Sequence, residues 1–264
     1  MMTAGTYALR DSTTMLRRNL RRLQRYPSLT VMLIGLPVVF LLLFVYVFGG
    51  TLGSGIDGAG GGRAEYANYI TPGILLLTIA STAQGTAIGI AMDMTEGIIN
   101  RFRTMAIHRP AVLTGHVLGS LIQSLLSLAV VVGAALLIGF RPTATPVEWV
   151  AAWGVLTGIA LAVTWLSVAL GLLAKSVETA SNLPMPLILL PFLGSGFVPT
   201  ESMPTAMRWF AEYQPFTAIM ETLRGLLLGT AIGSDGIVAV VWCAAVTAGA
   251  YVWAKALYDR DPSA

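Results

Sequence analysis

Long uncharged stretches separated by short charged segments are the main pattern of this chain. Six stretches lack Asp, Glu, Lys and Arg, and the shortest, between Asp235 and Lys255, still leaves 19 uncharged residues. A helix needs roughly 17 to 25 apolar residues to cross a bilayer, and a charge at its centre costs about 2.5 to 3.5 kcal/mol. The pattern therefore predicts six transmembrane helices, near residues 29–48, 70–92, 117–140, 149–173, 182–199 and 236–256.

Among the six predicted spans, the first has the most uniformly apolar sequence, and the fifth contains the most prolines. Residues 29–48 hold fifteen Leu, Ile, Val or Phe in twenty positions, and no small-residue cleavage site follows. We therefore expect an uncleaved first helix and not a signal peptide. The fifth window contains Pro184, Pro186 and Pro191, which a membrane helix tolerates where neighbours satisfy the freed carbonyl groups. We expect this helix to be kinked.

Composition agrees with a membrane location, and the position of charge predicts the orientation. Only 11% of the residues are charged and 55% are hydrophobic, with a mean hydropathy of +0.74, whereas soluble domains carry about 25% charge. Six windows place twelve Lys and Arg on the side of the N-terminus and four on the other side. Because basic residues stay in the cytoplasm, both termini are predicted to be cytoplasmic. We therefore predict an all-α membrane protein with a single transmembrane domain over 1–264, comprising a membrane domain at 29–257 and a tail at 258–264.

The segment before the first span, residues 1–28, contains a basic amphipathic pattern. On a helical wheel Leu9, Leu20 and Leu23 lie within about 20 to 40° of Leu16, and the arginines lie opposite. Such a helix lies along the inner membrane surface, with leucines in the acyl boundary and arginines at anionic head groups. The alternative is a cluster of charges that only sets topology. The residues predicted to form the interfacial helix are Leu9, Leu16, Arg17, Arg18, Leu20, Arg21, Arg22, Leu23 and Arg25.

The second cytoplasmic connection, residues 93–116, mixes acids, arginines and apolar residues. Ile98, Phe102 and Met105 recur at helical spacing and could fill a groove on another protein. An extension of the second and third spans that packs on its own bundle fits the pattern equally well. The residues that we predict to contact a partner are Glu96, Gly97, Ile98, Arg101, Phe102, Arg103 and Met105.

The two longer external connections differ in character. Residues 49–62 contain eight glycines in fourteen positions, which is typical of a flexible connector. Residues 201–235 are too apolar for a solvated loop, and we expect two short helices, about 203–213 and 216–229, that dip into the outer leaflet. An ordinary surface loop is the alternative. Glu221 and Arg224 are three positions apart and could pair on the second helix.

Motifs for chemistry within the chain are few. One cysteine, two histidines and no HExxH pattern argue against a disulfide framework or a zinc centre. The pair Lys175 and Ser176 follows Ala174, so it lacks the glycine that a P-loop needs. The letters GSGIDG at 53–58 have no surrounding βαβ unit, and we treat them as coincidence.

The six windows also lack the ionisable side chains that secondary transporters carry in their spans. They contain neutral polar groups, which either form hydrogen bonds between helices or line a path for an amphipathic substrate. These candidate path residues are Gln84, Ser120, Gln123, Ser124 and Asn182.

Taken together, the basic N-terminal helix, TEGIINRFRTMAIHRPAVLTG at 95–115 and GFVPTESMPTAMRWFAEYQPFTAIMETLRGLLLG at 196–229 resemble the ABC type-2 permease family. The likeness extends to daunorubicin-resistance-type membrane subunits. Glu96 and Gly97 match the acid-glycine turn of the family, and residues 101–103 match its basic-aromatic stretch. The run of acids before Gly97 is thinner than in many members. Pro199, Pro204, Pro215 and Arg224 match its external segment.

The resemblance implies an exporter of two permease copies, expected as a homodimer, and two cytoplasmic ATPase subunits that bind ATP and Mg²⁺. Residues 96–109 would be the coupling helix, and the external helices would form an outer gate that includes Phe216, Glu221 and Arg224. The substrates implied are hydrophobic or amphipathic drugs, polyketides or lipids. The alternatives are an ion-coupled secondary transporter and a membrane-embedded lipid-modifying enzyme, for which Asp93, Glu96, His108 and His116 are the nearest cluster.

Overall fold

The computed structural model describes residue 17 and residues 27–56, 62–97 and 109–259, and its regular elements in these ranges are helices. The long ones are α2 (Pro27–Leu43), which continues into the π-helix η1 (Phe44–Phe48) and α3 (Gly49–Ile56), then α4 (Arg63–Thr95), α6 (Arg109–Ile138), α7 (Pro146–Leu173) and α12 (Asp235–Asp259). The short ones are α8 (Val177–Asn182), α9 (Met185–Leu189), η3 (Thr200–Ser202), α10 (Thr205–Tyr213) and α11 (Pro215–Leu228).

Within the described residues, five helical segments are long and apolar enough to cross a membrane. They are Val31–Gly53, Arg63–Thr95, Leu113–Ile138, Pro146–Leu173 and Asp235–Asp259. These segments confirm five of the six predicted windows and the all-α class. The chain is therefore a multi-pass membrane protein.

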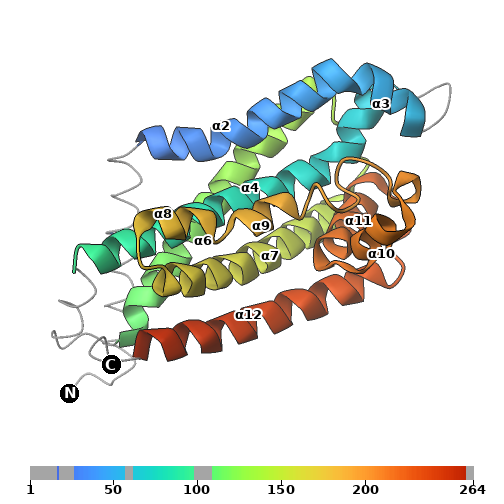
Figure 1. Cartoon of the computed structure of the whole chain (residues 1–264). Coiled ribbons are helices and arrows are strands. Elements are labelled where there is room, and N and C mark those ends of the chain that lie inside the picture. Colours follow the sequence, from blue (N-terminus) through green and yellow to red (C-terminus); the bar gives the residue numbers. More distant parts are fainter. Residues whose placement is uncertain (1–16, 18–26, 57–61, 98–108, 260–264) are drawn as a thin grey trace.

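Helix α4 occupies the centre of the bundle (Figure 1). It packs against α2, α6 and α7, and α12 packs along α7. Every residue from 70 to 83 is buried. We call the end of the bundle where α4 finishes and α6 begins the Asp93 end, and the end that carries α10 and α11 the Arg224 end. This arrangement places the polar groups of α4 between other helices.

Helix ends follow local sequence signals. Thr145 and Glu148 form a capping box at the start of α7, in which the Glu148 carboxylate accepts a hydrogen bond from the Thr145 N–H at 2.6 Å. Pro146 follows at the first helical position, where no N–H partner is needed. Gly229 ends α11 in the left-handed conformation, at φ 76°, which a glycine adopts without strain.

The kinked helix predicted at 182–199 is instead broken into separate pieces. The chain forms α8, then α9, and then a series of turns from 190 to 197. Pro184 stands at the N-cap of α9, and a proline lacks the N–H that would continue the ladder of hydrogen bonds from the preceding turn. In Figure 1, α8 and α9 follow one another along the bundle from the Asp93 end toward the Arg224 end.

The predicted flexible connector at 49–62 is also partly wrong. Its first half, Gly49–Ile56, is helix α3, which packs on α4. A Cβ atom added at Gly53 would lie 2.6 Å from the Gly62 carbonyl oxygen. Glycine thus serves close packing here as well as chain freedom. Residues 57–61 lie outside the described residues.

The two short helices predicted in the last connection are confirmed. The sequence favoured 203–213 and 216–229, and the structure has α10 at Thr205–Tyr213 and α11 at Pro215–Leu228. Helix α11 is largely buried against α4, α7 and α12, whereas Ala211 is the buried residue of α10. The apolar character of this connection therefore reflects burial of α11.

Candidate functional site

An acid and a histidine are buried together at the Asp93 end. His116 Nε2 lies 3.0 Å from Asp93 Oδ2, and the two residues are 8% and 2% exposed. Asp93 belongs to the last turns of α4 and His116 to the early turns of α6. Both helices are longer than predicted, so the candidate spans do contain ionisable groups. The sequence windows missed this because they stopped at 92 and began at 117.

The predicted coupling residues begin directly after α4, three positions beyond Asp93. Glu96 is exposed and caps α4, with its N–H bonded to the Met92 carbonyl at 2.9 Å. Gly97 has φ 69°, a left-handed conformation that lets the chain turn away from the helix axis. Ile98, Arg101, Phe102, Arg103 and Met105 lie outside the described residues. The acid-glycine turn thus stands where the helix stops.

Of the predicted interfacial helix, Arg17 is described as helical and exposed. The other residues of that prediction, Leu9, Leu16, Arg18, Leu20, Arg21, Arg22, Leu23 and Arg25, lie outside the described residues.

A polar seam joins α4 to α6 along the middle of the bundle. Thr82 Oγ1 and Ser124 Oγ are 2.6 Å apart, and one turn nearer the Asp93 end Thr86 bonds to Ser120. The α4 hydroxyls also donate to carbonyl oxygens within their own helix, as Thr82 does to Ile79. Ser120 and Ser124 therefore form hydrogen bonds between helices in this structure.

The other three candidate path residues, Gln84, Gln123 and Asn182, form none of the hydrogen bonds of this polar seam. Gln84 donates to the Ser181 carbonyl oxygen at 2.6 Å and so joins α4 to α8. Gln123 is buried on α6, and its Nε2 has no hydrogen-bond partner in the part of the chain that the structure describes. Asn182 is exposed at the end of α8.

Arg224 organises the opposite end of the bundle. Its side chain is 7% exposed, pairs with Glu221 as the spacing predicted, and donates to the Ser195 carbonyl oxygen at 2.9 Å and to the Tyr69 carbonyl oxygen at 3.2 Å. The guanidinium also lies 4.1 Å from the centre of the Tyr69 ring, within cation–π range. Arg224 therefore holds α11, α4 and the turns after α9 together.

Phe216, the third predicted gate residue, is buried on α11. Sequence reasoning missed Tyr69 and Ser195 because backbone carbonyl groups leave no residue-type signal. An arginine inside an apolar stretch was the available clue that buried acceptors must be near it.

Five phenylalanines gather near the Arg224 end and connect the first span to the turns after α9. The rings of Phe192 and Phe197 stack at 4.3 Å between centroids, and Phe44 of η1 lies 4.8 Å from Phe197. Phe40 and Phe48 extend the cluster along the first span. The π-helix presents this aromatic face, and π-bulges occur frequently at functional sites.

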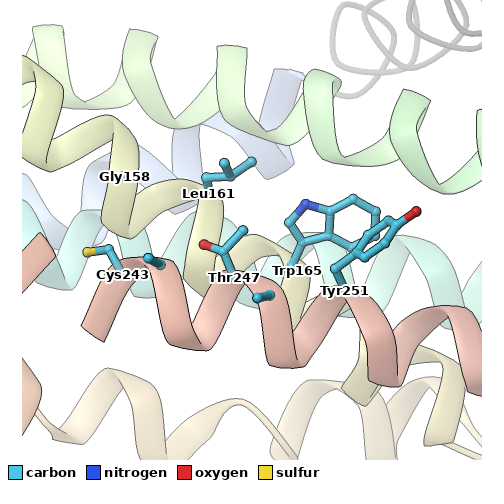
Figure 2. A pocket seen from close by; sticks show the side chains of 8 residues that line it. Gly158, Leu161, Trp165, Cys243, Thr247 and Tyr251 are labelled. Atoms are coloured by element: carbon cyan, nitrogen blue, oxygen red, sulfur yellow. The ribbon is translucent and has the colours of Figure 1, made fainter. Parts of the chain in front are cut away.

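An open groove of about 600 Å³ lies between α7 and α12 (Figure 2). Trp165 and Tyr251 meet edge to face at one end, with ring centroids 5.0 Å apart. Thr247 and Cys243 follow along α12 toward the other end. The lining is Gly158, Leu161, Trp165, Cys243, Ala244, Thr247, Ala248 and Tyr251.

Side chains that could bind a metal ion are spread over the described helices. In the described ranges, no three His, Cys, Asp or Glu gather closely enough to hold a metal ion.

Comparisons with known proteins identify the family of this chain. Residues 11–228 match the ABC-2 type transporter family. The chain is 30% identical over 230 residues to the daunorubicin resistance ABC transporter permease protein DrrB1 of Streptomyces coeruleorubidus, covering 86% of this chain and 78% of that protein. It is 26% identical over 244 residues to the probable doxorubicin resistance ABC transporter permease protein DrrC of Mycobacterium tuberculosis, covering 88% and 83%. This chain therefore belongs to the ABC-2 type transporter family, as a membrane permease subunit of an exporter.

Proposed function

We propose that the permease moves hydrophobic or amphipathic compounds, such as drugs, polyketides or lipids, from the cytoplasm or the inner leaflet to the outside. The family match over residues 11–228 carries this proposal. Daunorubicin and doxorubicin are the first probes to test, because the names of the relatives include them. The apolar lining of the groove between α7 and α12 supports a substrate of this class.

The working assembly consists of two permease copies, as a homodimer, and two ABC ATPase subunits that bind ATP and Mg²⁺ in the cytoplasm. Both termini of the permease are cytoplasmic. The outward faces of α2 and α12 support a second copy or lipid around the bundle, since large apolar residues such as Val31, Met32, Ile237 and Val240 are exposed there.

The segment from α8 to the turns after α9 is a sixth, broken crossing of the membrane. Its support is the path along the bundle in Figure 1 and the hydrogen bond from Gln84 that ties α8 to the central helix. Non-helical backbone at membrane depth is acceptable where protein covers it. Gly194, Ser195 and Gly196 are all buried.

Residues 96–109 dock on the ATPase, and the N-terminal interfacial helix passes the resulting movement to the first span. The sharp turn at Gly97 supports the docking role, because it redirects the chain at the end of α4. At the opposite end, α10 and α11 form a re-entrant pair at the outer gate. The exposed Trp209 and Tyr213 of α10 support a place at the membrane surface, where these residue types are enriched.

The central experiment reconstitutes the permease with its co-purifying ATPase in vesicles and measures ATP-dependent accumulation of doxorubicin. A catalytically inactive ATPase should abolish accumulation. Uphill accumulation by the permease alone, driven by a proton gradient, would instead support ion-coupled transport.

A second experiment tests the docking segment. Replacing Phe102 and Arg103 with alanine should reduce the amount of ATPase that co-purifies, while the amount of permease in the membrane stays unchanged. Replacing the exposed Arg208 and Glu212 of α10 provides a matched control at the other end. Unchanged co-purification of the Phe102 and Arg103 variant would argue against docking at this segment.

A further inference from the structure

The pair formed by Asp93 and His116 joins the two helices from which residues 96–109 depart and to which they return. Its polar atoms are 3.0 Å apart, and both side chains are within the candidate spans. Glu96 lies one turn beyond Asp93, and α6 begins at Arg109, two turns before His116. The pair therefore links α4 to α6 close to the points where the proposed coupling segment leaves one helix and joins the other.

A buried apolar cluster lies at the same end of the bundle as the pair. Ile90, Leu113, Val117 and Tyr258 form part of the buried cluster at this end of the bundle. Ionisable groups in such a place are expensive and occur mainly where they are paired or functional. Replacing a buried ion pair with well-packed apolar residues is often neutral or stabilising. Stability alone therefore gives no reason for an acid and an imidazole here.

The polar seam continues the connection between the same two helices. The pairs Thr86 with Ser120 and Thr82 with Ser124 follow on α4 and α6 away from Asp93. Hydroxyl groups donate and accept in many orientations, so these pairs tolerate a sliding movement. A carboxylate that accepts from a ring nitrogen is more demanding in partner and geometry, and it fixes one register.

We propose that Asp93 and His116 are a positioning pair that makes α4 and α6 move as one body when the ATPase pushes the coupling segment. Without the pair, the push would be absorbed by slippage between the two helices and would not reach the substrate path. This inference rests on the proposed coupling role of residues 96–109.

The test compares three variants with the wild-type complex in vesicles. The first is the double variant Asp93→Leu and His116→Leu, which removes the tie and retains apolar packing. The second is the exchange Asp93→His with His116→Asp, which restores the tie. The third is Asp259→Asn, a change of an exposed acid at the end of α12, which serves as the control.

Three quantities are measured for each variant: the ATPase that co-purifies, the rate of ATP hydrolysis, and the doxorubicin transported per ATP hydrolysed. The Leu variant should keep co-purification and hydrolysis within about twofold and lose at least tenfold in transport per ATP. The exchange should recover most of that ratio, and Asp259→Asn should match the wild type.

A Leu variant that transports as much per ATP as the wild type would overturn the inference. So would an exchange that folds and still transports no better than the Leu variant. If the Leu variant fails to fold, the single variant His116→Phe decides, because it removes the tie while retaining a ring of similar shape and should lose the ratio. Failure of the proposed coupling role has a different signature, since alanines at Phe102 and Arg103 would then leave co-purification unchanged.

Discussion

Single residues set how closely the backbone of the broken segment approaches the central helix. A Cβ atom at Gly73 would lie 2.8 Å from the carbonyl oxygen of Gly196 and 2.9 Å from its Cα atom. Both atoms belong to backbone, which cannot rotate away as a side chain does. Gly73 on α4 is therefore required by packing and not by its own backbone conformation.

Replacing Gly73 with alanine should lower the thermal stability of the purified permease by several degrees, because overpacking a close contact typically costs about 1 to 3 kcal/mol. Gly154→Ala on α7 is the matched control. No atom lies within 4 Å of a Cβ atom at that position, and alanine is the better helix former by about 1 kcal/mol. Equal melting temperatures for the two variants would contradict the packing shown here.

Arg224 gives the second prediction at this scale. Arg224→Met leaves Glu221, the buried Ser195 carbonyl and the partly buried Tyr69 carbonyl without their donor, and a buried acceptor left without a partner costs about 1 to 3 kcal/mol. Thermal unfolding should show a clear loss for Arg224→Met. Arg208→Met removes an exposed pair with Glu212 and should leave the unfolding temperature unchanged.

At the scale of elements, hydrophobic pattern predicted most helices and missed the interruption of one. α10 and α11 were predictable because Pro215 and Gly229 bracket an apolar run. The three prolines of the fifth window were visible in the sequence, but whether they bend or break a helix depends on neighbours that accept the open backbone. Likewise, the partners of Ser120 and Ser124 come from a helix distant in sequence.

Helix α10 yields an element-scale prediction about membrane depth. Trp209 is 66% exposed and its ring lies 5.4 Å from that of Tyr213, as expected at the interface between water and lipid. In a Cys243→Ser background, a spin label at Trp209→Cys should show an interfacial depth by oxygen and nickel accessibility. A label at Ala248→Cys, midway along α12, should be deeper. A label at 209 that is as deep as the one at 248 would place α10 inside the hydrocarbon.

At the scale of the whole molecule, the number of crossings depends on the segment between α7 and α10. Charge counting predicted six spans, and in the part of the chain that the structure describes five helices are long enough to cross without interruption. The orientation could be predicted only from the distribution of basic residues, because the packing of the helices does not show which end of the bundle faces the cytoplasm. Asp93 and His116 were grouped from the sequence as part of a cluster of ionisable residues, but their burial between α4 and α6 was not predicted, because both residues lie at the margins of apolar windows.

Six crossings place Ser176 and Ser202 on opposite sides of the membrane. In a Cys243→Ser background, an impermeant maleimide added to intact cells should label Ser202→Cys and leave Ser176→Cys unlabelled until the cells are opened. Labelling of both positions from outside would instead make the broken segment a hairpin that enters and leaves on one side.

The enclosure of α4 also limits how the range of exported compounds can change. Residues 70–83 are covered on all sides by neighbouring helices, so substitutions there disturb the scaffold before they alter recognition. Resistance to new compounds should accordingly arise from the peripheral helices, such as the walls formed by α7 and α12. Permease variants selected for resistance to new compounds should then carry few substitutions in α4 and most of their substitutions in the peripheral helices.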